Sequence, residues 1–204
     1  KHHRFDAFGA IPPRTKGDLA FLQHMLAVTN AQGMVGVVMP HGILFRGGAE
    51  GVIRQNIVQR DWFEAIIGLA PNLFFGASIP VAICVLNKDK APERRGKVLF
   101  IDAAQEGHFR PGKAQNFLDK EHSDSIVGAF NAFEDVERFA HVADLEEIRG
   151  NDFNLNISRY VDTTQQEEVV SVEQALAQLH EAEQQRDQAM GRMNKLLGEL
   201  GYAG

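Results

Sequence analysis

Three basic residues at loop positions are candidates for binding chemistry in this sequence. Arg14 and Lys16 lie in a stretch punctuated by glycine and proline, and Arg46 opens the glycine-rich turn Arg46-Gly47-Gly48-Ala49-Glu50-Gly51. Open α/β sheets bind ligands at the carboxyl ends of their strands, where we expect these loops to lie. The three side chains could contact phosphates there. Simple solvation of surface charge is the alternative.

Cysteine and histidine indicate no covalent or metal chemistry. Cys84, the one cysteine, lies in an apolar run, which indicates a buried thiol and neither a disulfide framework nor a zinc site. The eight histidines, among them the pair His2 and His3, do not fall at metal-ligand spacing, so we expect no metal. His41 follows a proline at the end of an apolar run and could be mistaken for a general base.

Charge is distributed unevenly along the 204 residues, whose formal net charge is −6. Residues 1–60 hold 7 basic and 3 acidic side chains (+4), whereas residues 161–204 hold 3 basic and 8 acidic ones (−5). This asymmetry fits phosphates near the front and a protein partner near the end, although ordinary solvated faces would look the same. The chain lacks the overall basic charge that nucleic-acid binding usually leaves.

The sequence also bounds location and completeness. It has no apolar run long enough to span a bilayer and no secretory signal, so we expect a cytoplasmic protein. The first residue is Lys1 and not methionine, which suggests a piece of a longer chain.

Apolar runs predict the sheet that positions the candidate residues. Residues 34–39 form a continuous apolar run, typical of a strand buried on both faces. A helix over 52–59 and strands over 64–69, 81–86 and 97–102 follow. Only a turn separates the strands 64–69 and 81–86, which is too short for a crossover helix, so this pair should be antiparallel.

The remaining elements are predicted from periodicity and turn signals. We expect residues 1–17 to be loop and Asp18 to cap a helix over 19–29. Asp18 could also order the entrance of the active site. After Asp102 the strand signal fades. A loop over 105–115, helices over 117–133 (with Asp124 near its start) and 145–149, and an irregular segment over 151–160 follow.

One long helix is predicted over residues 171–200. Its apolar residues fall at spacings of four and three, with Glu183 and Arg186 in the same seam, which favours coiled-coil-like packing on a partner. A helix folded back on its own domain is the alternative. The seam comprises Val172, Leu176, Leu179, Met190, Met193, Leu197 and Leu200.

Several segments between residues 4 and 163 together resemble the modification (methyltransferase) subunit of type I restriction–modification systems, a family of adenine-N6 DNA methyltransferases. The combination is specific, whereas each segment alone would be a weak signal. The segments are Arg4-Phe5, Gly9-Ala10-Ile11-Pro12-Pro13, Gly17-Asp18-Leu19-Ala20-Phe21-Leu22, the run from Val37 to Gly51, the run from Ile67 to Gly76, and the run from Asn151 to Tyr160.

The resemblance implies an α/β fold: the C-terminal half of a Rossmann-like, S-adenosylmethionine-dependent methyltransferase sheet with an antiparallel last strand pair, followed by a helical tail. The corresponding domains would be a loop over 1–17, the catalytic half-domain over 18–103, an irregular extension over 104–165, and a docking helix over 166–204. DNA, a specificity subunit bound through residues 171–200, and a restriction subunit would be the partners.

The family's cofactor loop and its catalytic Asn-Pro-Pro-Phe tetrapeptide precede the matched region, and the tetrapeptide does not occur in this sequence. We therefore expect no catalytic residue in this chain and no activity of the chain alone. A non-catalytic docking module for the specificity subunit is the alternative function, and an unrelated Rossmann-like small-molecule enzyme is a third.

The resemblance also implies roles for aromatic residues. In related enzymes the turn before the last strand supplies a ring on which the flipped target base stacks, which indicates Phe74 first and Phe75 second. Phe21 matches a position near the cofactor adenine, with a core position as the alternative. Because methylation of an amine by a sulfonium needs no histidine base, we expect His41 to be structural.

Overall fold

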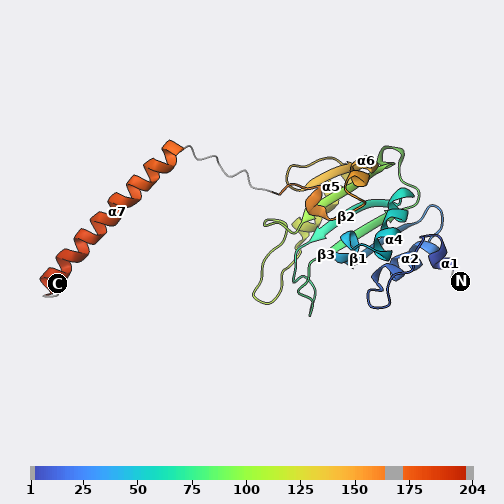
Figure 1. The fold of residues 1–204 in the computed structure, drawn as a ribbon, viewed down its shortest axis with the longest axis horizontal. Coiled ribbons are helices and arrows are strands. Elements are labelled where there is room, and N and C mark those ends of the chain that lie inside the picture. The colour runs from blue at the N-terminus through green and yellow to red at the C-terminus, as the bar shows by residue number, and fades with distance from the viewer. Residues whose placement is uncertain (1–2, 164–171, 201–204) are drawn as a thin grey trace. The chain divides into compact units, whose positions relative to one another are not determined.

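The computed structural model describes residues 3–163 and 172–200, which belong to two compact units, Lys1–Thr163 and Thr164–Gly204 (Figure 1). Each unit is considered by itself.

The first unit is built on a five-stranded sheet with the order β1-β3-β2-β4-β5. Its strands are β1 (Met34–Pro40), β2 (Phe63–Leu69), β3 (Val81–Asn87), β4 (Lys97–Ala103) and β5 (Ala140–Asp144). The predicted antiparallel pairing of β2 with β3 is confirmed, and β2 runs parallel to β4. Since β1 is also antiparallel to β3, the strands β1, β2 and β4 point the same way.

The prediction that the sheet ends near Asp102 is wrong. β5 pairs antiparallel with β4, with Lys97 opposite Asp144 and Ile101 opposite Ala140. The segment is short and partly polar, so it has no apolar run to identify it. Its backbone hydrogen bonds to the edge of β4 make it a strand.

Helices cover both faces of the sheet. They are α1 (His3–Asp6), α2 (Asp18–Val28), α3 (Gly42–Phe45), α4 (Ala49–Gln59), α5 (Lys120–Ala132) and α6 (Leu145–Gly150), with 3-10 turns η1 (Pro92–Arg94) and η2 (Ile157–Arg159). Three details correct the sequence prediction. The loop expected over 1–17 contains α1, the short α3 was not foreseen, and the helix predicted over 117–133 begins later, at Lys120, with Asp119 as its N-cap.

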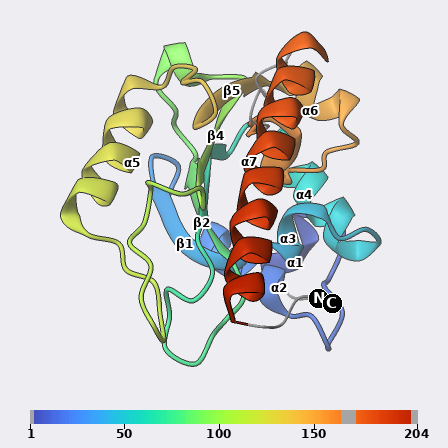
Figure 2. The ribbon, with the colours of Figure 1, turned by 90° about the vertical axis from the view of Figure 1, so that its left-hand side faces the viewer.

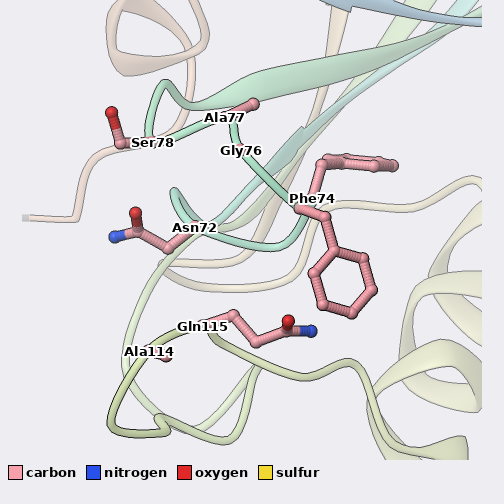
Figure 3. Close-up of a pocket in the computed structure, with 8 residues that line it drawn as sticks. Asn72, Phe74, Gly76, Ala77, Ser78, Ala114 and Gln115 are labelled. Carbon is pink, nitrogen blue, oxygen red and sulfur yellow. The ribbon is translucent and has the colours of Figure 1, made fainter.

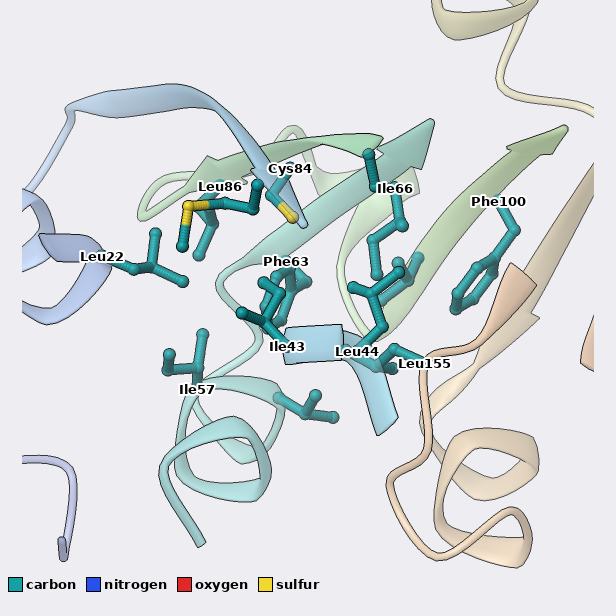
Figure 4. Packing of buried hydrophobic residues seen from close by; sticks show 14 of the residues in the cluster. Leu22, Ile43, Leu44, Ile57, Phe63, Ile66, Cys84, Leu86, Phe100 and Leu155 are labelled. Atoms are coloured by element: carbon teal, nitrogen blue, oxygen red, sulfur yellow. The ribbon is translucent and has the colours of Figure 1, made fainter. Parts of the chain in front are cut away.

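The first face of the sheet is packed against α2, α3 and α4 (Figure 2). Leu22, Ile57 and Leu44 meet strand residues such as Phe63 in one buried cluster (Figure 4). The segment after α6 closes this cluster, because the Tyr160 ring stacks on Phe100 at a centroid distance of 3.8 Å. Apolar burial of this kind contributes about 25 cal/mol per Å² to folding.

The second face is covered by α5 over β4 and β2, where Ile126 and Ala129 join Ile101 in a second cluster. Over β1 and β3 this face stays partly open: Met34 and Val38 are exposed, and Val38 lies opposite half-buried Ile83. The prediction that β1 is buried on both faces is therefore wrong for this chain. Only its other face, with Val35 and Met39, is buried.

Cys84 is fully buried in β3, as expected, and burial raises the pKa of its thiol to about 12. The thiol is therefore neutral in the folded protein near neutral pH and is a packing residue.

The second unit contains α7 (Val172–Glu199), which confirms the helix predicted over residues 171–200 and ends one residue earlier than predicted. Ser171 and the side chain of Val172 lie outside the described residues. The other predicted seam residues are exposed, as is Leu196. Glu183 pairs with His180 at 3.4 Å and Arg186 with Asp187 at 2.8 Å, so the two seam charges do not pair with each other. Within the described residues, no helix has the length and hydropathy needed to cross a membrane.

Candidate functional site

The loops that carry the predicted site residues gather at one edge of the sheet. Because β1, β2 and β4 point the same way, their carboxyl ends share this edge. The segments 41–48, 70–80 and 104–119 leave from these three strand ends, and α2 begins near it, since Asp18 reaches Arg46 just after α3. This is the edge at which open α/β sheets bind ligands.

The turn between β2 and β3 displays two phenylalanine rings. Asn72 (φ 56°) and Gly76 (φ 73°) adopt left-handed backbone conformations, and the Ala77 amide donates to the Phe74 carbonyl oxygen at 3.1 Å. The tight turn leaves Phe74 45% exposed and Phe75 91% exposed. Two exposed rings on a fixed turn are suited to stacking on a planar ligand.

The loop after β4 is fastened to this turn. The Asn116 backbone amide donates to the Asn72 carbonyl oxygen and its side-chain amide donates to the Pro71 carbonyl oxygen, both at 2.8 Å. Arg110 and Phe117 pair across the base of the loop, and Arg110 binds Asp119 at 2.6 Å. Sequence reasoning missed this connection, because a single asparagine in a loop gives no periodic signal.

The turn and the loop together line a hollow of about 400 Å³ that is open to solvent (Figure 3). This volume is within the range of small-molecule sites. The hollow is lined by Asn72, Phe74, Phe75, Gly76, Ala77, Ser78, Ala114 and Gln115.

A second cluster at the same edge contains Arg46. Its guanidinium lies 3.5 Å from Asp18 and 3.4 Å from the buried carboxylate of Glu50. The prediction that Asp18 is an N-cap is wrong: Asp18 is the first residue of α2, Gly17 precedes the helix, and no side-chain cap bond forms. The carboxylate instead serves the ion pair. Because two acidic neighbours offset the positive charge of Arg46, its electrostatic attraction for a phosphate is weaker than the sequence suggested.

Arg54 is a buried anchor beneath this cluster and was not singled out from the sequence. Its side chain is 4% exposed and donates to the carbonyl oxygens of Ile43 (3.0 Å), Arg46 (2.9 Å) and Phe153 (2.7 Å). Burial lowers the pKa of Arg54, and the nearby Glu50 opposes that shift. The contacts tie α3 and α4 to the segment after α6.

The other predicted binding residues are accessible. Arg14 and Lys16 are exposed in the loop before α2. Phe21 on α2 is 68% exposed, so the alternative that it belongs to the core does not hold in this chain. Their proposed roles toward phosphate and cofactor remain predictions.

His41 makes a structural contact. Its Nε2 lies 2.9 Å from the Val81 carbonyl oxygen, which identifies the Nε2-protonated ring as the donor. The bond links the end of β1 to the start of β3, in keeping with the structural role expected for it.

One group of ligand atoms contradicts the expectation that no histidine reaches metal-ligand spacing. Asp119, Glu121 and His122 present atoms within 4.8 Å of one another. These atoms already have partners, since Asp119 binds Arg110 and the His122 Nδ1 accepts the Asp119 backbone amide at 3.0 Å. The contacts between Asp119 and His122 form the capping box at the start of α5.

Comparison with known proteins identifies the family. A family model described as N-6 DNA Methylase matches residues 1–169. The chain belongs to the N-6 DNA methylase family. The resemblance to type I modification subunits is thereby confirmed, together with the fold that it implied.

Relatives of this N-6 DNA methylase chain are type I methylase subunits. It is 41% identical to the MjaVII methylase subunit of Methanocaldococcus jannaschii over 89% of this chain and 31% of that protein. The MjaVIII methylase subunit of the same organism is 38% identical over 83% of this chain and 29% of that protein. The chain thus spans about a third of the length of these relatives.

A solved structure agrees in fold. The type I restriction-modification methyltransferase subunit from Streptococcus thermophilus superposes with a TM-score of 0.74 at 42% identity, over 79% of this chain and 34% of that one.

Proposed function

We propose that this chain is part of a type I restriction–modification methyltransferase subunit that transfers a methyl group from S-adenosylmethionine to adenine N6 in DNA. The observation that carries the proposal is the pair of exposed phenylalanines beside a hollow at the carboxyl edge of an N-6 DNA methylase sheet. We also propose a cytoplasmic location, which is where a restriction–modification subunit would meet DNA in a cell without a nucleus.

The phenylalanine turn would receive the target base. An enzyme that modifies a base must extrude it from the duplex, and an aromatic face compensates for part of the lost stacking. Phe74 remains the first choice, because its ring is half held by the protein and loses less freedom on binding than the almost fully exposed Phe75. Arg14 and Lys16, with Arg46 as a weaker candidate, would contact phosphates.

The chain's residues fit only part of the cofactor. The exposed ring of Phe21 offers a face for the adenine of S-adenosylmethionine, which when bound supplies the electrophilic methyl group. The Asn-Pro-Pro-Phe tetrapeptide, which the resemblance implies as the catalytic motif, is not among the 204 residues. We therefore assign no catalytic residue to this chain and propose that it is inactive alone.

The open side of β1 supports the proposal that the rest of the parent subunit completes the sheet. Within the described residues β1 has a hydrogen-bonded neighbour, β3, on one side only. An unpaired strand edge beside exposed Met34 and Val38 is a surface that a further strand and helix would cover.

The exposed stripe on α7 favours a protein partner. A single helix with one apolar stripe is marginal in water and gains stability by burying that stripe. We propose the specificity subunit as the partner of residues 171–200, with the restriction subunit in the same assembly. The same observation favours the second candidate function, in which the chain acts only as a docking module.

Alanine substitutions in the complete methyltransferase, assembled with its specificity subunit, test the base site. Phe74→Ala should lower the single-turnover methylation rate roughly 5- to 150-fold, because base–aromatic stacking contributes about 1–3 kcal/mol. DNA affinity should change little, since phosphate contacts dominate it. A 2-aminopurine at the target position should also fluoresce differently in this variant.

Phe45→Ala is the matched control, because Phe45 is 47% exposed but does not line the hollow. A loss of rate confined to Phe75→Ala would move the stacking role to that ring. Unchanged rates in both Phe74→Ala and Phe75→Ala would refute the base site.

A further inference from the structure

Stacking alone cannot select adenine, because every base presents a π-face. Selection requires hydrogen-bonding groups that match a base edge. Adenine presents the N6 amino donor beside a ring-nitrogen acceptor, and a side-chain amide pairs with this pattern through two hydrogen bonds. A site that accepts adenine is therefore expected to place an amide beside the stacking ring.

The hollow offers three polar side chains, those of Asn72, Ser78 and Gln115. The Gln115 side chain extends to the same side of the turn as Phe74, whereas those of Asn72 and Ser78 point to the other side (Figure 3). Among the lining residues, Gln115 thus has its amide directed toward the aromatic face.

The neighbouring amides of the same loop are already engaged. Gln105 donates from Nε2 to Asp102 at 2.9 Å, and Asn116 donates to the Pro71 carbonyl oxygen. Within the described part of the chain, the Gln115 amide has no such hydrogen bond, and the residue is half-buried. Its donors and acceptor are available to a ligand.

The position of Gln115 is fixed by the sheet. The turn and the loop leave adjacent parallel strands at Leu69 and Ala103, which lie opposite each other. Asn116, the next residue, joins the two segments through both of its amide groups. Gln115 is therefore held against the phenylalanine turn before any ligand arrives.

From this geometry we propose that Gln115 is a specificity-determining residue whose side-chain amide hydrogen-bonds the edge of an adenine stacked on the phenylalanine turn, at N6 and one ring nitrogen. The inference rests on the proposed function and deepens it, because the stacking ring by itself accepts any base.

The test uses the complete methyltransferase with its specificity subunit and cognate duplexes that carry adenine, 7-deazaadenine or 1-deazaadenine at the target. Each analogue keeps N6 and lacks one ring nitrogen. Gln115→Leu should methylate adenine roughly 5- to 150-fold more slowly than the wild type. One of the two analogues should lower the methylation rate of the wild type below its rate on adenine. The same analogue should leave the rate of Gln115→Leu unchanged from the rate of that variant on adenine.

Gln59→Leu is the matched control, since Gln59 is an exposed glutamine at the end of α4 that does not line the hollow. It should respond to the analogues as the wild type does. Gln115→Glu is a second variant that keeps length and polarity but cannot donate to a ring nitrogen, and it should lose the same analogue sensitivity.

Two results would overturn the assignment. The first is that Gln115→Leu methylates adenine at the wild-type rate. The second is that Gln115→Leu is slower but responds to both analogues as the wild type does, which is the result that a purely structural role would give. A wild-type complex that does not methylate DNA at all would instead refute the proposed function, and the inference would fall with it.

Discussion

Replacing Arg54 by methionine tests whether one buried cation stabilises the charged cluster of Asp18, Arg46 and Glu50. The substitution keeps most of the aliphatic volume and removes three hydrogen bonds, to the carbonyl oxygens of Ile43, Arg46 and Phe153 at 2.7–3.0 Å. It also removes a buried positive charge that interacts electrostatically with Glu50, which forms an ion pair with Arg46 at 3.4 Å.

The expected loss of unfolding free energy is about 3–5 kcal/mol. Hydrogen bonds to charged groups contribute roughly 1.5–3 kcal/mol each, and the cost of burying the guanidinium offsets part of their sum. Removing a buried charge and leaving its partners unsatisfied costs about this amount in other proteins.

Urea unfolding of the 204-residue chain, followed by fluorescence, measures the effect. Trp62 is the one tryptophan of the sequence and lies in the first unit, with its ring 6.2 Å from that of Phe8. Arg159→Met is the control, because the exposed Arg159 makes a long 3.4 Å contact with Asn151, and we expect a change below about 0.5 kcal/mol. A loss below about 1 kcal/mol in Arg54→Met would show that the carbonyl groups find other partners and that the reasoning is wrong.

Two further predictions concern the 204-residue chain by itself and the complete subunit. Calorimetric titration of the 204-residue chain should detect no micromolar binding of S-adenosylmethionine, because only Phe21 of the proposed cofactor contacts is present; a micromolar Kd would contradict the proposed inactivity. Deleting residues 171–204 from the complete subunit should abolish co-purification with the specificity subunit while leaving the sheet folded. Met193→Asp on the exposed stripe of α7 should weaken assembly. Gln188→Asp, on the same helix but outside the stripe, is the control and should assemble normally. Normal assembly of the deletion variant would show that this helix is not the docking element.

The central strands could be predicted because their signals are local. The apolar runs of β2, β3 and β4 are continuous, and the short connection between β2 and β3 allows only an antiparallel pair. The family segments likewise placed Phe74 and Phe75 on a turn between two strands. These features depend on residue type and spacing within one stretch of chain.

Other features depend on residues that are distant in sequence. β5 is a strand because β4 offers it an edge, and Asp18 pairs with Arg46 because α2 begins where α3 ends. The burial of β1 on both faces was predicted from its apolar composition, but exposure depends on what lies beside the strand.

The sequence by itself indicated the family, the succession of the central strands along the chain with one antiparallel pair, and the aromatic turn, because these depend on contiguous segments whose apolar runs and turn residues act locally. Only the tertiary structure decided that the loop after β4 is fastened to that turn, that Arg54 is a buried anchor, and that Gln115 lies beside the phenylalanine rings. The physical reason is that parallel pairing of β2 with β4 brings together segments more than 40 residues apart, as in the bond between Asn116 and Pro71, and such a contact leaves no periodic signal in the sequence.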